Sequence, residues 1–348
     1  MSDRPRILAV ATAVPPHRLA QSDVRKWARR SFADHDGDIE RLLPAYDNAG
    51  IEVRYSCVPL SWYDDDHGWR DKNELYLSNA SDLTEAAATQ CLQRGGVDAA
   101  DIGAVVCVST SGIATPSLDA RLISRLGLGP EVQRMPLFGL GCAGGVLGLA
   151  RAAELATARP GRPVLLLVAE LCGLTFRRAD LSKSNVIATA LFGDGAAAAL
   201  ISTEGDGAVV IGWGEHTWPD TLGVMGWSVE DDGLGVIFSR DIPALVRRDL
   251  PAVVDTYLTR LGLDLGAIDG FICHPGGAKV VTALEDVFGL EPGGLKTTRD
   301  VLRDYGNMSA ASVMFVLERT LANGASGAYL MSALGPGFTA GLTTIECR

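Results

Sequence analysis

The chain has 348 residues, of which 47% are hydrophobic and 21% are charged, an ordinary composition for a globular protein. Because one hydrophobic core seldom grows beyond roughly 250–300 residues, this length predicts two core units. The formal net charge of −11 argues against a nucleic-acid-binding surface. No apolar run approaches the roughly 20 residues of a membrane-spanning helix, so no membrane span is expected.

The first apolar run, ILAVATAV at residues 7–14, follows two arginines and so resembles the start of an export signal. It is short and is followed by Pro15 and Pro16, which predicts a buried strand instead. Further strand-like runs alternate with helix-like segments. This alternation indicates an α/β fold with buried strands, at residues 104–109, 164–169, 196–201, 270–273 and 328–331.

Seven cysteines are scattered along the chain, and none forms the C-x₂-C pairs that are typical of zinc sites. Without a recognisable export signal, they are expected to be reduced thiols in a cytoplasmic protein. No metal site is predicted from this pattern.

The chain repeats itself at a constant offset. The segment GVDAADIGAVVC at 96–107 matches GLDLGAIDGFIC at 262–273 in its Gly, Asp, Ile and Cys positions, 166 residues further on. Apolar helix-like segments obey the same offset. We infer a duplication with halves at residues 1–205 and 206–348, packed about a pseudo-twofold axis and joined near the polar segment 202–209.

Cys142 lies in GLGCAGGVLGLARAAELA at 139–156, directly before a helix that is apolar nearly all round and is therefore expected to be buried. The positive end of the helix dipole and its unpaired N–H groups favour a thiolate at this position. Gly141, Gly144 and Gly145 leave room for a ligand to approach the backbone. The structural alternative is a small buried cysteine at a close helix contact, the commoner situation for a single cysteine.

His274 ends an apolar strand and opens the turn HPGGAK, a position at which α/β folds expose functional groups. Asn307 lies between Gly306 and a helix, where the structural alternative is an N-cap. The repeat places the turns of Cys142 and Asn307 at equivalent positions, so a pseudo-twofold axis would bring them and His274 towards one centre. A thiolate with imidazole and amide donors suits acyl transfer through a thioester, with the two donors stabilising an oxyanion.

At these residues the chain resembles the type III polyketide synthases, the chalcone and stilbene synthase-like enzymes. Five motifs occur in the family's order: GCAGG at 141–145, LFGDGAAAAL at 191–200, CHPGGAK at 273–279, GNMSAAS at 306–312 and ALGPGFT at 333–339. The resemblance implies a thiolase-like αβαβα five-layered fold, usually a homodimer.

The resemblance also implies a reaction. Cys142 takes an acyl group from a starter acyl-CoA, while His274 and Asn307 promote decarboxylation of malonyl-CoA and stabilise the enolate. Repeated Claisen condensations then build a polyketide that cyclises in the same cavity. The family needs no carrier protein, metal or other cofactor, because acyl-CoA and malonyl-CoA are its substrates.

Further residues match the family's substrate pocket. Phe192 matches an aromatic residue that gates the cavity, whereas Val236 stands where plant enzymes usually have a second aromatic gate. This departure predicts a wider passage, unless Trp227 swings into it. Positions on the cavity wall or near the nucleophile are matched by Thr110, Cys172, Thr175 and Ser309. The basic cluster that binds CoA phosphates in plant enzymes maps onto residues 41–48, where only Arg41 is basic, and the candidate substitutes are Arg54, Lys279 and the backbone of Gly276 and Gly277.

The runs VPLSWY at 58–63 and STSGIATPSLDARL at 109–122 resemble bacterial members of the family. Several of these accept fatty acyl starters and make alkylresorcinols or alkylpyrones. We therefore predict a medium-to-long fatty acyl starter and a resorcinol or pyrone product, with acetyl, malonyl or aromatic starters as the alternatives.

Three other functions compete with this interpretation. A ketosynthase III-like enzyme of fatty acid synthesis shares the fold and the Cys-His-Asn set, but typically carries H-Q-A-N where this chain has HPGG. A papain-like protease has Cys, His and Asn in this order, but an aromatic residue follows its cysteine and a duplicated α/β pattern does not fit it. A non-catalytic partner subunit is opposed by the presence of all three residues.

Overall fold

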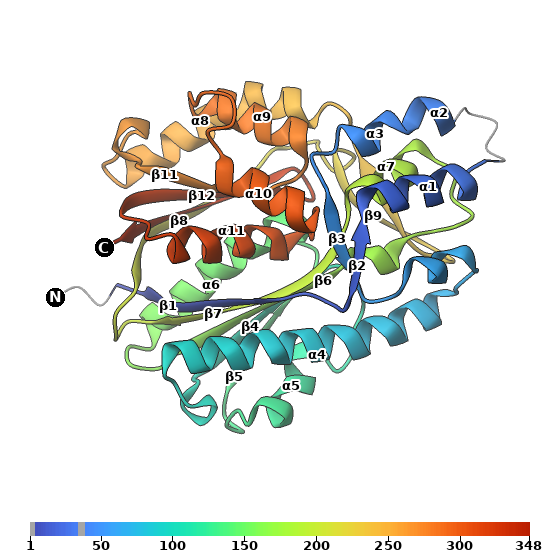
Figure 1. Cartoon of the computed structure of the whole chain (residues 1–348). Helices are drawn as coiled ribbons and strands as arrows, with labels where there is room; N and C mark the ends of the chain where they lie inside the picture. Colours follow the sequence, from blue (N-terminus) through green and yellow to red (C-terminus); the bar gives the residue numbers. More distant parts are fainter. Residues whose placement is uncertain (1–3, 34–38) are drawn as a thin grey trace.

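The computed structural model describes residues 4–33 and 39–348. Within these residues, nine strands form one continuous sheet, shown in Figure 1. In order across the sheet they are β11 (Gly270–Cys273), β12 (Gly327–Gly335), β13 (Thr339–Cys347), β8 (Ala208–Thr217), β1 (Arg6–Ala13), β7 (Asp194–Ser202), β6 (Val164–Leu171), β4 (Ala104–Val108) and β5 (Gln133–Leu137).

The sheet has the same pairing pattern on both sides of its centre. In the first half β4 pairs in parallel with β6, which pairs antiparallel with β7. In the second half β11 pairs in parallel with β12, which pairs antiparallel with β13. β1 and β8 join the halves, and β4 and β11 begin 166 residues apart. The duplicated architecture predicted from the repeat is therefore confirmed.

The two halves of the sheet form two layers, and helices form the other three of the five layers that Figure 1 shows. The central layer is α6 (Gly144–Ala158) and α11 (Ala310–Ala322), which contact strands of both halves. α4 (Trp69–Gly95) and α5 (Leu118–Leu126) cover the outer face of the first half. On the opposite side α8 (Ile242–Arg260) and α9 (Ala278–Val287) share a hydrophobic cluster with β12 and β13, and α10 (Lys296–Tyr305) packs on α11.

The central helices are apolar because both of their sides are covered. Ten of the fifteen residues of α6 are buried, in agreement with the prediction of a buried helix after Cys142. A Cβ atom on Gly145 would lie 2.4 Å from the carbonyl oxygen of Ala310, so α6 and α11 approach each other at a point that only glycine permits. This contact brings together the two helix starts that carry Cys142 and Asn307.

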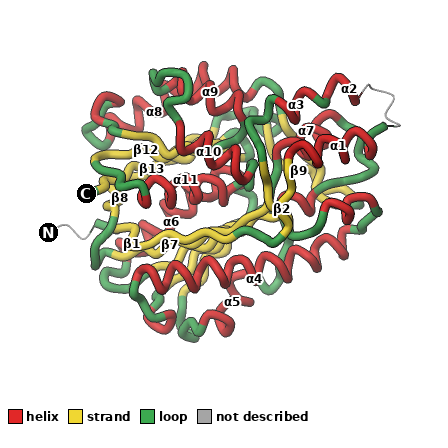
Figure 2. Tube along the Cα trace, viewed as in Figure 1, coloured by secondary structure: helices red, strands yellow, loops and turns green. Residues whose placement is uncertain are grey.

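Two small ribbons stand away from the main sheet, beside α1 and α7, as Figure 2 shows. One pairs β2 (His17–Ala20) with β3 (Val53–Ser56), and the other pairs β9 (Met225–Glu230) with β10 (Gly233–Phe238). The helices of this region are α1 (Gln21–Ser31), α2 (Ile39–Leu42), α3 (Pro44–Asp47) and α7 (Lys183–Leu191). Short 3₁₀ turns occupy Leu60–Asp64, Ala99–Asp101, Gly141–Ala143, Cys172–Thr175 and Leu265–Ala267.

The predicted strands lie where the apolar runs placed them, and the first run forms β1. Residues 203–207 connect β7 to β8, within the segment predicted as the junction between the halves. The division at 205/206 itself stays a prediction. Among the helices of residues 4–33 and 39–348, none has the length and apolar character needed to cross a membrane.

Candidate active site

Cys142 is presented by a tight turn between β5 and α6. It lies in the 3₁₀ turn Gly141–Ala143, immediately before the first residue of α6. Gly141 has a φ of +45°, and a Cβ atom there would lie 2.5 Å from Pro336. The Gly141 N–H donates to the hydroxyl of Thr110 at 3.1 Å. Thr110 is thus placed where it holds the turn of the cysteine.

His274 and Asn307 reach the same cavity from the second half. His274 directly follows β11, its side chain is buried, and neither ring nitrogen has a hydrogen-bond partner among the described residues. Asn307 donates from Nδ2 to the Gly276 carbonyl at 3.2 Å and accepts at Oδ1 from the Ser309 N–H at 2.8 Å. α11 begins only at Ala310, so Asn307 is not the N-cap of this helix.

Burial disfavours charge on both members of the Cys142–His274 pair when each is considered by itself. Burial raises the pKa of Cys142 to about 12, although a hydrogen bond with Ser309 lowers it in part. Burial also lowers the pKa of His274 to about 3. Because both residues line one cavity, proton transfer from thiol to imidazole would create two opposite charges, whose attraction opposes the cost of burying each. Burial by itself opposes the thiolate expected at Cys142, which stays a prediction.

We call the space lined by these three residues the Cys142 cavity. Its wall is mostly apolar and also includes Phe192, Cys172, Trp227, Val236 and Ser309. Trp227 pairs with Val236 across the β9–β10 ribbon, and its ring meets that of Phe192 edge-on at 6.0 Å. An aromatic ring is therefore present beside Phe192, supplied by the neighbouring strand. The sequence leaves two possibilities beside Val236, a wider passage or an opening filled by Trp227. The structure has Trp227 in this opening.

A second cavity adjoins the first on the side of the first half. Cys172, Phe192 and Val236 line both cavities, so the two spaces meet at these residues. Thr175 lines only the second of the two, and its hydroxyl donates to the Cys172 carbonyl at 2.7 Å. The remaining wall is largely apolar and includes Leu19, Val24, Trp27, Leu60, Tyr63 and Phe176.

A third space, which we call the basic groove, opens beside the Cys142 cavity and shares Gly276 with it. Gly277 and Lys279 line the groove, and so does Arg41 from the segment 41–48. The structure adds Lys183 and Arg240, which sequence reasoning missed. No local motif marks these two residues, because they reach the groove from α7 and from the turn after β10.

Arg54 does not belong to the groove, contrary to the prediction that it substitutes for a phosphate-binding residue. Its side chain is buried and donates to the carbonyl oxygens of Thr189, Ala190 and Phe192. Burial lowers its pKa to about 10. Arg54 instead satisfies the carbonyls at the end of α7 and so supports the backbone of Phe192.

Two buried carboxyl groups near the cavities were also missed. Glu170 is the one charged residue in the otherwise apolar strand β6, and its Oε2 accepts from the Thr110 N–H at 3.2 Å. Asp194 accepts from the N–H groups of Cys57 and Gly173. Burial raises the pKa of Glu170 to about 7 and that of Asp194 to about 6. A charged residue inside an apolar strand was the available signal for Glu170.

Among residues 4–33 and 39–348, no group of His, Cys, Asp or Glu side chains is arranged to hold a metal ion.

The chain matches both models of one family. Residues 2–205 match the chalcone and stilbene synthases, N-terminal domain, and residues 214–345 match the C-terminal domain. A 1,3,6,8-tetrahydroxynaphthalene synthase of Streptomyces peucetius subsp. caesius is 38% identical over 96% of this chain and 91% of that protein.

Solved structures agree with this match. The 1,3,6,8-tetrahydroxynaphthalene synthase of Streptomyces coelicolor A3(2), a bacterial type III polyketide synthase, superposes with a TM-score of 0.94 at 27% identity and covers 99% of both chains. The C-terminal type III polyketide synthase domain of Steely1, a type I/III hybrid from Dictyostelium, gives 0.92 at 26% identity over 99% of both chains. With five layers, two matching halves and a cysteine at the central helix start, the chain belongs to the chalcone and stilbene synthase family and is a type III polyketide synthase, a condensing enzyme of the acyltransferase type.

Proposed function

We propose that the chain loads an acyl starter on Cys142 as a thioester and extends it by decarboxylative condensation with malonyl-CoA. The observation that carries this proposal is the meeting of Cys142, His274 and Asn307 in one apolar cavity beside a basic groove. The unpaired ring nitrogens of His274 leave it able to accept or donate a proton there.

Loading requires the thiol to lose its proton. In the proposed step, His274 accepts the Cys142 proton while the sulfur attacks the starter carbonyl. The Sγ–acyl bond forms, the bond from acyl carbon to CoA sulfur breaks, and the departing CoA thiolate takes the proton from His274. The low dielectric of the cavity favours this return to uncharged groups.

Extension requires stabilisation of an enolate. When malonyl-CoA loses CO₂, the electron pair of the broken carbon–carbon bond passes to the thioester oxygen. Asn307 Nδ2 uses one hydrogen for the Gly276 carbonyl, so its second hydrogen remains for that oxygen, together with a ring N–H of His274. The enolate carbon then attacks the acyl thioester, forming a new carbon–carbon bond and releasing the Cys142 thiolate.

The basic groove supports binding of the CoA part of both substrates. Four basic side chains line it, from Arg41, Lys183, Arg240 and Lys279, on a chain whose net charge is −11. Such a local cluster attracts phosphate groups although the molecule as a whole repels anions. Because Gly276 lines both spaces, the groove lies directly beside the Cys142 cavity.

For the starter, we propose a medium-to-long fatty acyl group and a resorcinol or pyrone product. The apolar second cavity supports this choice, because burial of each methylene favours binding by about 0.8 kcal/mol. The second candidate is malonyl-CoA as both starter and extender, giving a naphthalene-type product. It is favoured by the relative named 1,3,6,8-tetrahydroxynaphthalene synthase and by Trp227, which occupies space beside Phe192.

Loading is tested by incubating the protein with acyl-CoA and mapping the adduct by peptide mass spectrometry. We expect the acyl group on Cys142 and none on the Cys142→Ser variant. An adduct on Cys172 or Cys273, with Cys142 unmodified, would contradict the assignment.

The starter is tested by kcat/KM along a series from acetyl-CoA to palmitoyl-CoA, with products identified by mass spectrometry. We expect a maximum at medium-to-long chains and a shift towards short chains in Val236→Phe, whose added ring narrows the meeting of the two cavities. A naphthalene product from malonyl-CoA alone, with no turnover of longer starters, would establish the second candidate instead.

A further inference from the structure

The β9–β10 hairpin supplies a wall of the Cys142 cavity, yet it does not pair with the nine-stranded sheet. Its paired residues Trp227 and Val236 both line the cavity, and Trp227 meets Phe192 there. A two-stranded ribbon is at best marginally stable by itself in water. The position of Trp227 therefore depends on whatever holds the hairpin in place.

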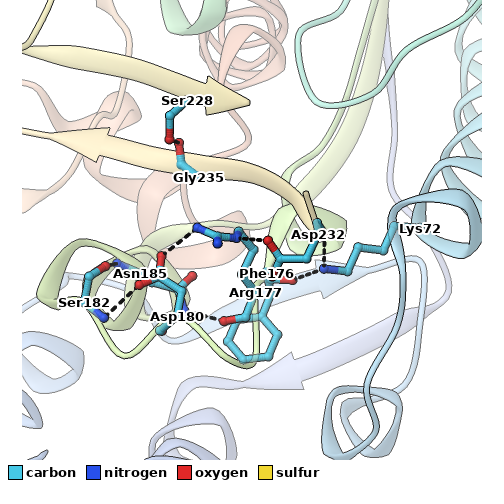
Figure 3. Close-up of polar contacts among 9 residues, drawn as sticks. All are labelled: Lys72, Phe176, Arg177, Asp180, Ser182, Asn185, Ser228, Asp232 and Gly235. Carbon is cyan, nitrogen blue, oxygen red and sulfur yellow. Dashed lines mark hydrogen bonds and ion pairs between the residues drawn. The ribbon is translucent and has the colours of Figure 1, made fainter. Parts of the chain in front are cut away.

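Three residues hold the tip of the hairpin, as Figure 3 shows. Asp232, in the turn between the strands, accepts at Oδ1 from Arg177 Nε at 2.6 Å. Its carbonyl oxygen accepts from Lys72 Nζ of α4 at 3.3 Å, and the same ammonium donates to the Phe176 carbonyl at 2.7 Å. We call Lys72, Arg177 and Asp232 the tip clasp.

Arg177 also packs directly on β10. A Cβ atom on Gly235 would lie 3.1 Å from Arg177 Nη1 and 2.5 Å from Ser228 Oγ, so glycine makes room for the guanidinium. Ser228 donates to the Gly235 carbonyl at 3.4 Å across the ribbon. Ser228 and Gly235 are the immediate neighbours of Trp227 and Val236. The clasp therefore acts on the backbone next to the two cavity-lining residues.

The other end of the clasp leads to Phe192. Arg177 Nη1 pairs with Asp180 at 3.2 Å, and Asn185 Nδ2 donates to the carbonyls of both residues. Asn185 belongs to the first turn of α7, whose last residue is Leu191, and Phe192 follows directly. Figure 3 shows these contacts as one group on the side of the hairpin that faces α7. The hairpin that carries Trp227 and the helix that leads to Phe192 are therefore held by the same set of polar contacts.

We propose that the tip clasp determines substrate specificity by fixing Trp227 relative to Phe192, and so sets which acyl chains extend from Cys142 into the second cavity. Arg177 and Asp232 are positioning residues that act through the hairpin. That the substrates are acyl chains carried on Cys142 rests on the proposed function. The clasp itself rests only on the contacts of Asp232, Arg177 and Lys72.

The test compares two variants in the same turn. Asp232→Asn removes the charge that pairs with Arg177 and keeps the shape of the side chain. Asp231→Asn makes the same chemical change at the neighbouring, exposed position and is the matched control. Asp232→Glu restores the carboxylate. Hydrogen–deuterium exchange of peptides covering 225–238 reports on the hairpin, and kcat/KM along the acyl-CoA series reports on specificity.

In Asp232→Asn we expect at least tenfold faster exchange in 225–238, with unchanged exchange in 327–347. We also expect the ratio of kcat/KM between the best and worst starters to fall at least threefold, mainly through KM. Asp231→Asn should match the wild type, and Asp232→Glu should recover at least half of the selectivity.

Two results would overturn the proposal. Unchanged exchange in 225–238 would show that Asp232 does not hold the hairpin. Faster exchange with an unchanged chain-length profile would show that the clasp does not set specificity. If only malonyl-CoA is turned over, the proposed starter fails, and the distribution of malonyl units in the products replaces the chain-length profile as the readout for the clasp.

Discussion

His274 and Asn307 have different surroundings, and this difference separates their roles at the scale of single residues. His274 has two buried ring nitrogens without partners among the described residues, whereas Asn307 is held at both ends of its amide by backbone groups. A fixed amide can only donate to a developing charge, but an unpaired imidazole can also move a proton. In the proposed mechanism both residues stabilise the enolate, and only His274 takes part in loading.

We therefore expect His274→Ala and Asn307→Ala to lower the rate of malonyl-CoA decarboxylation by about 10²-fold or more, the usual effect of removing an oxyanion donor. Asn307→Ala should still form the acyl thioester on Cys142, because the thiol proton goes to His274. Release of CO₂ from labelled malonyl-CoA measures the first effect and mass spectrometry the second. The exposed Asn323→Ala is the control, and wild-type decarboxylation in both variants would refute the pairing.

The buried carboxyl group of Glu170 should make the free energy of unfolding depend on pH. Burial raises its pKa to about 7, so the folded chain binds the proton more tightly than the unfolded chain does. Its contribution to stability is complete below the unfolded pKa of about 4.3 and is lost as pH rises through about 7. Glu170→Gln should thus raise the free energy of unfolding by about 1–3 kcal/mol at pH 8 relative to wild type, and by much less at pH 4.

Urea unfolding at pH 4 and pH 8 measures this difference, with the exposed Glu131→Gln as the matched control. An equal effect of Glu170→Gln at both pH values would show that folding does not raise the pKa of this carboxyl group.

At the scale of elements, the crossing of α6 and α11 brings the two halves of the site together. Gly145→Ala places a methyl group 2.4 Å from the Ala310 carbonyl and 2.5 Å from Val313, and the backbone atom cannot move aside without shifting the helix. We expect a loss of about 1–3 kcal/mol in unfolding free energy, the usual cost of overpacking a core. Thermal or urea unfolding measures it.

Gly68→Ala is the control for this substitution. Gly68 precedes α4 with an ordinary φ of −73°, and a Cβ atom there meets nothing within 4 Å. If Gly145→Ala is as stable as Gly68→Ala, the two central helices are not as closely packed as the structure has them.

At the scale of the whole molecule, we predict a homodimer. β5 forms one edge of the nine-stranded sheet of the described residues, and Phe138, which follows it, is 60% exposed. An unpaired edge strand and an exposed aromatic side chain both favour association with a second copy. Sedimentation should give about twice the chain mass of 36.7 kDa, and Phe138→Asp should weaken the dimer at least tenfold.

The exposed Val229→Asp, on the β9–β10 hairpin, is the control for association. A monomer at micromolar concentration in the wild type would refute the prediction.

Much of the fold was predictable because it depends on short-range patterns. Buried strands read as continuous apolar runs, and β6 and β7 are buried along their whole length. The 166-residue offset predicted that Cys142 and Asn307 lie at equivalent helix starts, because duplicated segments adopt the same local structure. The pocket was less predictable. The sequence suggests Arg54 as a phosphate-binding residue, whereas its buried contacts with Ala190 and Phe192 join residues more than 130 positions apart.

The amino-acid sequence alone predicts the α/β class, the duplication, and the cysteine, histidine and asparagine that line one cavity in the structure. These follow from periodicity and short motifs, which are local properties of the chain. The folded arrangement was needed to find that Trp227 lies beside Phe192, that Lys183 and Arg240 line the basic groove, and that Arg177 pairs with Asp232 at the tip of the hairpin. Each of these depends on side chains from separate elements meeting in space, and no spacing along the chain encodes such a meeting.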